Sequence, residues 1–135
     1  WYAWVHPTDK PRFRMAAAGS AVTGKIHFIG GSYQAHHFNG QSYTGRAATP
    51  SKEIWTYDVD ARNWSVTESN SATGDHRGLL KIGDHWVTLG GMGQLEQENG
   101  QSILEVISTP IIHKSPAVKP SAKPATRPAV TANPN

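Results

Sequence analysis

The chain of 135 residues has a formal net charge of +3, contains no cysteine, and is 37% hydrophobic and 17% charged. This length is typical of one domain, and the absence of cysteine excludes disulfides, thiolate zinc sites and cysteine nucleophiles. The 13 glycines and 9 prolines favour turns and short strands over long helices.

The predicted elements are strands, separated in several places by the turn signals Thr23-Gly24, Asp60–Asn63 and Gly83-Asp84. No stretch shows the sustained 3.6-residue apolar period of a helix, so the sequence predicts an all-β chain. In chain order the predicted strands are Met15–Val22, Lys25–Ile29, Glu53–Val59, Trp64–Glu68, Arg77–Ile82, His85–Leu89 and Ser102–Ser108. The stretch TPIIHK at 109–114 is a candidate for the last strand.

The positive charge is concentrated in residues 114–135, where Pro116, Pro120, Pro124 and Pro128 recur at regular intervals. This segment holds four basic residues and no acid, which leaves 13 − 4 = 9 basic and 10 acidic residues in 1–113, a net charge of −1. We predict a folded part at 1–113 and a disordered linker or tail at 114–135. The alternative for residues 114–135 is a basic arm that binds polyanions. Because the folded part is close to neutral, we predict no nucleic-acid partner.

An internal repeat is the main clue in the sequence. Gly30-Gly31 ends one predicted strand and Gly90-Gly91 ends another, and the offset between these pairs equals the offset between Trp4 and Trp64. Tyr57-Asp58 lies between the first glycine pair and Trp64. A repeat with a period of about 50 residues is typical of propeller blades.

In this ordered set the chain resembles the kelch repeat, in which a strand ending in Gly-Gly is followed by a loop, a strand with Tyr-Asp, a turn and a Trp. The resemblance covers roughly residues 4–108, but the second copy has no Tyr-Asp and no closing Trp. It implies four-stranded antiparallel blades of a β-propeller, with Gly30, Gly31, Tyr57 and Trp64 in structural roles. Trp4 would end a preceding blade.

The length of the chain does not fit a closed ring, which needs about four to eight blades. Residues 1–113 hold one full blade, one degenerate blade and a leading strand. We therefore expect an incomplete ring: either the C-terminal part of a longer propeller whose missing blades close it, or a chain that closes the ring by assembling with other copies.

The candidate binding residues lie in loops that antiparallel blades place on one face. These loops are Pro7–Arg14, Ser32–Ser51, Ser69–His76 and Met92–Gln101, and long loops often carry function. The residues that we predict to contact a ligand are Arg12, Arg14, Tyr33, His36, His37, Arg46, His76 and Arg77, with Tyr43 beside them. Arg14 and Arg77 would stand near the channel mouth and could bind a carboxylate in bidentate fashion.

The sequence contains no motif that predicts binding of a metal ion or a cofactor. His36 and His37 are adjacent, so in an extended chain they point in opposite directions, and no spaced third ligand accompanies them. Kelch-type copper oxidases use a tyrosine cross-linked to cysteine, which this chain cannot form. We expect no metal and no cofactor.

The sequence thus favours a binding module for a protein or a carbohydrate. The alternative is a carbohydrate-active kelch enzyme, similar to the sialate mutarotases, with its site over the channel; whether the chain is an enzyme stays open. No apolar run predicts a membrane span. Localisation is also open, with a Pro/Ala/Lys linker and no cysteine favouring a secreted or bacterial envelope protein.

Overall fold

A computed structural model describes residues 7–8, 10–37, 40–75, 78–96 and 102–113. In these residues all regular structure is β, which confirms the predicted all-β class. None of them forms a helix long and apolar enough to cross a membrane. The proposed division at residue 113 stays a prediction, because residues 114–135 lie outside the described part.

The first sheet is an antiparallel meander of four strands in chain order, β1-β2-β3-β4. Its strands are β1 (Ala16–Ser20), β2 (Lys25–Ile29), β3 (Ser51–Asp58) and β4 (Asn63–Thr73). The predicted strands overlap all four, and β2 agrees at both ends. The predicted four-stranded antiparallel sheet is therefore confirmed, while its identity as a propeller blade stays a prediction.

The turn between β3 and β4 shows how local sequence sets this meander. The Asp58 carboxylate accepts a hydrogen bond from the Ala61 N–H at 2.8 Å and pairs with Lys25 of β2 at 3.5 Å. The bond from Ala61, followed by the Lys25 charge, lowers the pKa of Asp58 from its ordinary value. Arg62 closes the turn with a φ of 53°.

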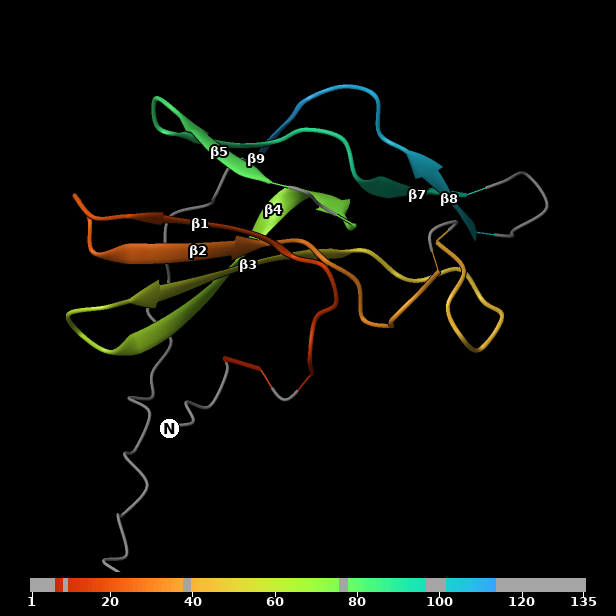
Figure 1. Ribbon diagram of the computed structural model, residues 1–135, viewed down its shortest axis with the longest axis horizontal. Helices are drawn as coiled ribbons and strands as arrows, with labels where there is room; N and C mark the ends of the chain where they lie inside the picture. The colour runs from red at the N-terminus through yellow and green to blue at the C-terminus, as the bar shows by residue number, and fades with distance from the viewer. Residues whose placement is uncertain (1–6, 9, 38–39, 76–77, 97–101, 114–135) are drawn as a thin grey trace, which may run out of the picture.

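The second half of the chain forms a three-stranded sheet of order β5-β6-β9 and a separate hairpin, β7-β8. These strands are β5 (Leu79–Ile82), β6 (His85–Thr88), β7 (Met92–Glu96), β8 (Ser102–Val106) and β9 (Ile111–His113). In Figure 1 the β5-β6-β9 sheet lies above the first sheet, and the β7-β8 hairpin extends to one side. The stretch 109–114 thus supplies the last described strand, as predicted.

The second sheet repeats the pairing register of the first. Phe28 lies two positions before the first glycine pair and is opposite Trp55 of β3, and Thr88 lies two positions before the second pair and is opposite Ile111 of β9.

We call the bend of the chain at each glycine pair a Gly-Gly corner. At both corners the carbonyl of the second glycine accepts a hydrogen bond from a backbone N–H of the segment that leads back to the sheet. Ser51 donates to Gly31 at 2.8 Å, and Ile107 donates to Gly91 at 3.0 Å. Trp55 and Ile111 each come four positions after that donor, so β9 is the counterpart of β3. In place of the loop 32–50, the second copy carries the β7-β8 hairpin.

Two predicted loops are wrong in part. The sequence predicts a loop at Ser69–His76, but β4 continues to Thr73. Residues 69–72 lie opposite Lys52 alone, so this irregular bulge of several extra residues lets the strand bend and rejoin β3 at Ser51. The sequence also predicts a loop at Met92–Gln101, but its first half is β7, which pairs with β8 and bridges Gly74 at the end of β4.

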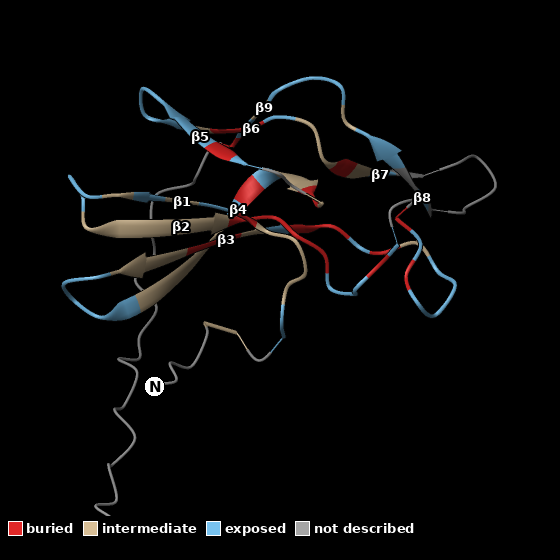
Figure 2. Ribbon diagram, viewed as in Figure 1, coloured by how far each residue is buried: buried red, intermediate tan, exposed pale blue. Residues whose placement is uncertain are grey.

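The hydrophobic core lies between the two sheets. Ala16, Ile29 and Ile54 of the first sheet form a buried cluster with Leu79 of β5, and Trp86 of β6 packs against it. Figure 2 shows the buried segments gathered where the sheets meet and along the chain that continues from the ends of β2 and β3. Alternation along the strands therefore directs one face of the first sheet to the second sheet.

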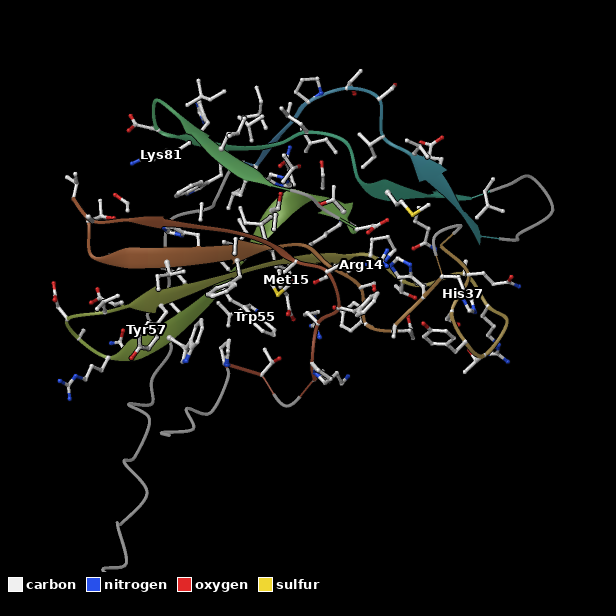
Figure 3. All side chains as sticks on the ribbon, in the orientation of Figure 1. Arg14, Met15, His37, Trp55, Tyr57 and Lys81 are labelled. Atoms are coloured by element: carbon white, nitrogen blue, oxygen red, sulfur yellow. The ribbon has the colours of Figure 1, made fainter. Side chains whose placement is uncertain are left out.

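The opposite face of the first sheet carries its large aromatic side chains. Trp64 of β4 lies with its ring 4.9 Å from the Tyr57 ring and 5.7 Å from the Phe28 ring. Trp55 of β3 lies on the same side, and Figure 3 shows Trp55 and Tyr57 on the side away from Lys81 of β5.

Candidate functional site

The described part of the insert 32–50 between β2 and β3 is held by short backbone pairings. Isolated bridges join Ser32 to Pro50, His36 to Ser42, and Gln41 to Ala47. The Ala48 N–H also donates to the Gly40 carbonyl at 2.9 Å. These bonds fold the long predicted loop back on itself, so its described side chains project from a defined backbone.

Arg12 is the side chain that fastens the base of this insert to β3. Its Nη2 donates to Glu53 Oε2 at 2.5 Å, and its Nε donates to Ser51 Oγ at 3.4 Å. Its Nη1 donates to the carbonyls of Lys10 at 3.0 Å and Pro11 at 3.2 Å. Only 1% of the Arg12 side chain is exposed.

Aromatic rings complete the surroundings of Arg12. Its guanidinium lies 3.8 Å from the centre of the Tyr33 ring and 5.5 Å from that of Trp55. The Trp55 indole N–H donates to the same Glu53 oxygen at 2.9 Å. All three guanidinium nitrogens of Arg12 donate hydrogen bonds within the protein, and aromatic rings lie beside them. The Arg12 side chain is therefore enclosed by internal partners and is not accessible.

The two adjacent histidines have different environments. His36 is buried; its Nδ1–H donates to the His37 carbonyl at 2.8 Å, and its ring meets the edge of Phe13 with centroids 5.2 Å apart. His37 is exposed, and its ring lies 4.4 Å from that of Tyr43 in an edge-to-face arrangement. The pair therefore does not present two ligands to one ion.

Tyr43 is the more exposed of the two tyrosines in the insert, with 69% of its surface exposed. Tyr33 is 39% exposed, with its ring stacked on Arg12. Arg46 and His37 are also exposed. We call these four residues, Tyr33, His37, Tyr43 and Arg46, the insert surface.

Arg14 lies at a junction between the two sheets. Its Nη1 donates to Asp75 Oδ1 at 2.8 Å, and 31% of its side chain is exposed. Both residues have positive φ, 55° for Arg14 and 50° for Asp75, which marks them as residues held at sharp bends. His76 and Arg77, also predicted to bind a ligand, lie outside the described residues. The structure thus brings Arg14 near the end of β4 but does not test whether Arg14 and Arg77 stand together near a channel mouth.

A buried polar link that sequence reasoning missed joins the two sheets. His113 of β9 is 1% exposed, with Nδ1 2.7 Å from Ser69 Oγ of β4 and Nε2 2.8 Å from Thr88 Oγ1 of β6. One ring nitrogen donates and the other accepts if the imidazole is neutral. In the sequence this residue appears only as a histidine in the apolar segment IIH. That pattern does not reveal Ser69 and Thr88 as its partners.

His27 of β2 lies between the sheets near two lysines. Its Nδ1 is 2.9 Å from Thr56 Oγ1, and its ring centroid is 4.6 Å from that of Trp86. Burial first, and then the charges of Lys25 and Lys81, lower the pKa of His27 below its ordinary value of 6.5. This histidine is therefore biased toward the neutral form.

The described residues contain no group of three or more His, Asp or Glu side chains that could hold a metal ion. Two open hollows of about 500 Å³ each lie away from the insert surface. One follows the β1-β2 turn over 19–26, and the other lies between the β4 bulge and the segment 105–111. No residue predicted to bind a ligand lines either hollow.

The comparisons with known proteins do not identify a family. No protein-family model matches the chain, and a search of curated proteins finds no significant match. The kelch resemblance therefore stays a prediction from the sequence.

Proposed function

We propose that the chain is a segment of a kelch-type β-propeller and that it acts as a binding module for a protein or a carbohydrate. The ligand would contact the insert surface, Tyr33, His37, Tyr43 and Arg46. Two sheets with the same register, each closed by a Gly-Gly corner, support the interpretation as consecutive blades. Contacts between β1 and β5 bring the first strands of both sheets together, which also fits neighbouring blades.

The observation that carries the binding proposal is the contrast between the base and the surface of the insert. At its base Arg12 and His36 are buried and engaged in internal hydrogen bonds. At its surface, Tyr43 and His37 form an exposed ring pair on a backbone fixed by bridges. Exposed aromatic rings on a rigid loop are a common basis of recognition.

Of the two ligand classes, the insert surface favours a carbohydrate. A sugar presents a flat C–H face that can stack on Tyr43, and hydroxyls that can accept hydrogen bonds from Arg46. The enzymatic alternative has less support, since Arg14, one of the two arginines predicted at the channel mouth, is already paired with Asp75.

The test is binding of the full chain to an array of immobilised neutral and acidic oligosaccharides. We expect saturable binding to one class, weakened about tenfold or more in Tyr43→Ala because a central aromatic contact is lost. Val22→Ala is the matched control, because Val22 is exposed in the β1-β2 turn, outside the insert.

Two results would contradict the carbohydrate version of the proposal. One is that no oligosaccharide binds the wild type, and the other is that Tyr43→Ala and Val22→Ala bind equally well. Saturable binding of a purified protein that is sensitive to Tyr43→Ala would instead assign the insert surface to a protein partner.

A further inference from the structure

The three-stranded sheet is incomplete when it is compared with the four-stranded one. In the first sheet β3 pairs with β2 along one edge and with β4 along the other. Its counterpart β9 pairs only with β6 in the described part of the chain. Thr56 of β3 corresponds to Ile112 of β9, and Thr56 pairs with Ser65 of β4. No described strand occupies the equivalent place beside Ile112.

The backbone of Ile112 faces this open edge, as the pairing of β5 with β6 shows. Gly83 and Asp84 form a two-residue turn, so the flanking residues Ile82 and His85 are a hydrogen-bonded pair. Hydrogen-bonding direction alternates along a strand, so Val87 bonds to β5 while Trp86 and Thr88 bond to β9.

The same alternation continues into β9. Trp86 and Thr88 pair with His113 and Ile111, which leaves the N–H and C=O of Ile112 pointing away from β6. Ile112 is also 48% exposed. An unpaired strand edge of this kind is a template for another strand.

The following segment of the same chain is a poor candidate for that strand. A counterpart of β4, placed after β9 as β4 is placed after β3, would occupy 119–129. That stretch contains Pro120, Pro124 and Pro128. Proline has no N–H to donate, and repeated prolines are not compatible with a paired strand.

Residues 1–6, WYAWVH, have the composition that the edge requires. They contain three aromatic residues, a valine and no proline. Trp4 precedes Trp64, at the start of β4, by the same offset that separates the glycine pairs, which makes Val5 the counterpart of Ser65. If residues 1–6 paired with β9 as β4 pairs with β3, Val5 would lie opposite Ile112 and Trp4 opposite His113.

The positions of the two segments favour a partner from another molecule. Figure 1 shows β9 above the first sheet, while the described chain at 10–13 runs below it. We propose that β9 accepts residues 1–6 of a second copy of this chain as an antiparallel fourth strand, with Val5 opposite Ile112. Pro110, two residues before Ile112, has no N–H, so the pairing begins at Ile112 and continues toward the end of β9. This inference does not depend on ligand binding by the insert.

Disulfide trapping between full-length chains tests the pairing and its register. The chain has no cysteine, so Val5→Cys in one chain and Ile112→Cys in another introduce the only thiols. Directly paired residues have a Cα separation suitable for a disulfide. After mild oxidation of the mixture we expect about tenfold more mixed dimer than with the control Leu80→Cys, because pairing raises the effective concentration of the two thiols. Leu80 of β5 is a matched control at 47% exposure on the other edge strand of the same sheet.

Solution mass provides an independent readout. We expect light scattering to show a concentration-dependent oligomer of the wild type, and Ile112→Pro to shift it to monomer by removing the outward N–H. Equal trapping with Ile112→Cys and Leu80→Cys would overturn the proposal, as would a monomeric wild type at all concentrations. In a chain carrying both Val5→Cys and Ile112→Cys, a disulfide found only within monomers would overturn the exchange between copies.

Discussion

The two Gly-Gly corners share one hydrogen-bonding scheme, but Gly31 of the first pair and Gly90 of the second have different surroundings among the described residues. At the first corner, a Cβ on Gly31 would lie 2.8 Å from Met15 Cγ and 2.9 Å from the Phe13 carbonyl. At Gly90, which is the first glycine of the second pair, the nearest described atom to an added Cβ would be the Ile107 carbonyl oxygen at 4.0 Å. Both glycines have positive φ, and Gly31 also needs the absence of a Cβ for close approach.

The close approach at Gly31 comes from the segment that precedes the first sheet. Phe13 bridges Ser32 next to the first corner, and Arg12 fixes that segment to β3. Glycine pairs therefore set where the chain turns, and at Gly31 long-range packing also restricts the turn. Four changes test this contrast, from the largest expected effect to the smallest.

Removing the Arg12 side chain should have the largest effect, because it leaves the partly buried Glu53 carboxylate without its charged partner. We expect Arg12→Ala to lower the free energy of unfolding by about 3–5 kcal/mol, measured by urea denaturation. Arg14→Ala is the control: its pair with Asp75 is 31% exposed on the arginine side, and its loss should cost about 1 kcal/mol or less. If Arg12→Ala and Arg14→Ala lower the free energy of unfolding equally, Arg12 does not stabilise the first corner more than an exposed ion pair would.

Adding one methyl group should separate Gly31 from Gly90 directly. We expect Gly31→Ala to lower the free energy of unfolding by about 3 kcal/mol or more, because the backbone of Phe13 and Met15 must move. Gly90→Ala should cost about 1–2 kcal/mol, which is the cost of positive φ alone. Thermal and urea unfolding measure both, and a Gly90 effect as large as that of Gly31 would refute the contrast.

His113 should be the main polar link between the halves that carry the two corners. Its replacement by alanine leaves Ser69 and Thr88 without their ring partner in a buried place. We expect His113→Ala to lower the free energy of unfolding by about 2–3 kcal/mol. The exposed His85 of β6 is the control, and His85→Ala should change stability by less than about 0.5 kcal/mol. If the two variants unfold at the same urea concentration, the link contributes nothing.

The smallest effect concerns pH and the packing of β2 against β6. The pKa of His27 is lowered in the folded state, so the unfolded chain binds a proton more readily. Stability is therefore complete above the ordinary pKa of 6.5 and decreases as pH falls below it. We expect His27→Gln, which keeps a partner for Thr56, to lose less stability than the wild type as the pH falls from slightly alkaline to mildly acidic. Parallel slopes of urea midpoint against pH would show that His27 is not the responsible group.

Local sequence patterns were sufficient for much of the fold. The β-branched and aromatic residues of β3, the turn with Asp58 and Asp60 after it and the Gly-Gly pairs after β2 and β6 are short-range signals, and these strands form where they predict. The bulge at 69–72 and strand β7 were missed because each depends on a distant partner. Ser69 in the bulge bonds to His113, and β7 follows from pairing with β8 and Gly74.

The candidate binding residues illustrate the same limit. In the sequence, five of these residues look alike as polar or aromatic loop residues: Arg12, Arg14, Tyr33, His36 and Arg46. The structure buries Arg12 and His36, pairs Arg14 with Asp75, and leaves Arg46 exposed with Tyr33 half covered. Burial depends on contacts such as that of Arg12 with Glu53, which lie far apart in the chain, and no local pattern encodes them.

The sequence by itself determined the β class, the positions of the turns and the internal repeat of glycine pairs, because turn signals and glycine conformations act over a few residues. Only the tertiary structure decided which arginine and which histidine are buried, and which strand edge has no partner in the described part of the chain. Those outcomes depend on desolvation and on backbone pairing between segments that are distant in the chain.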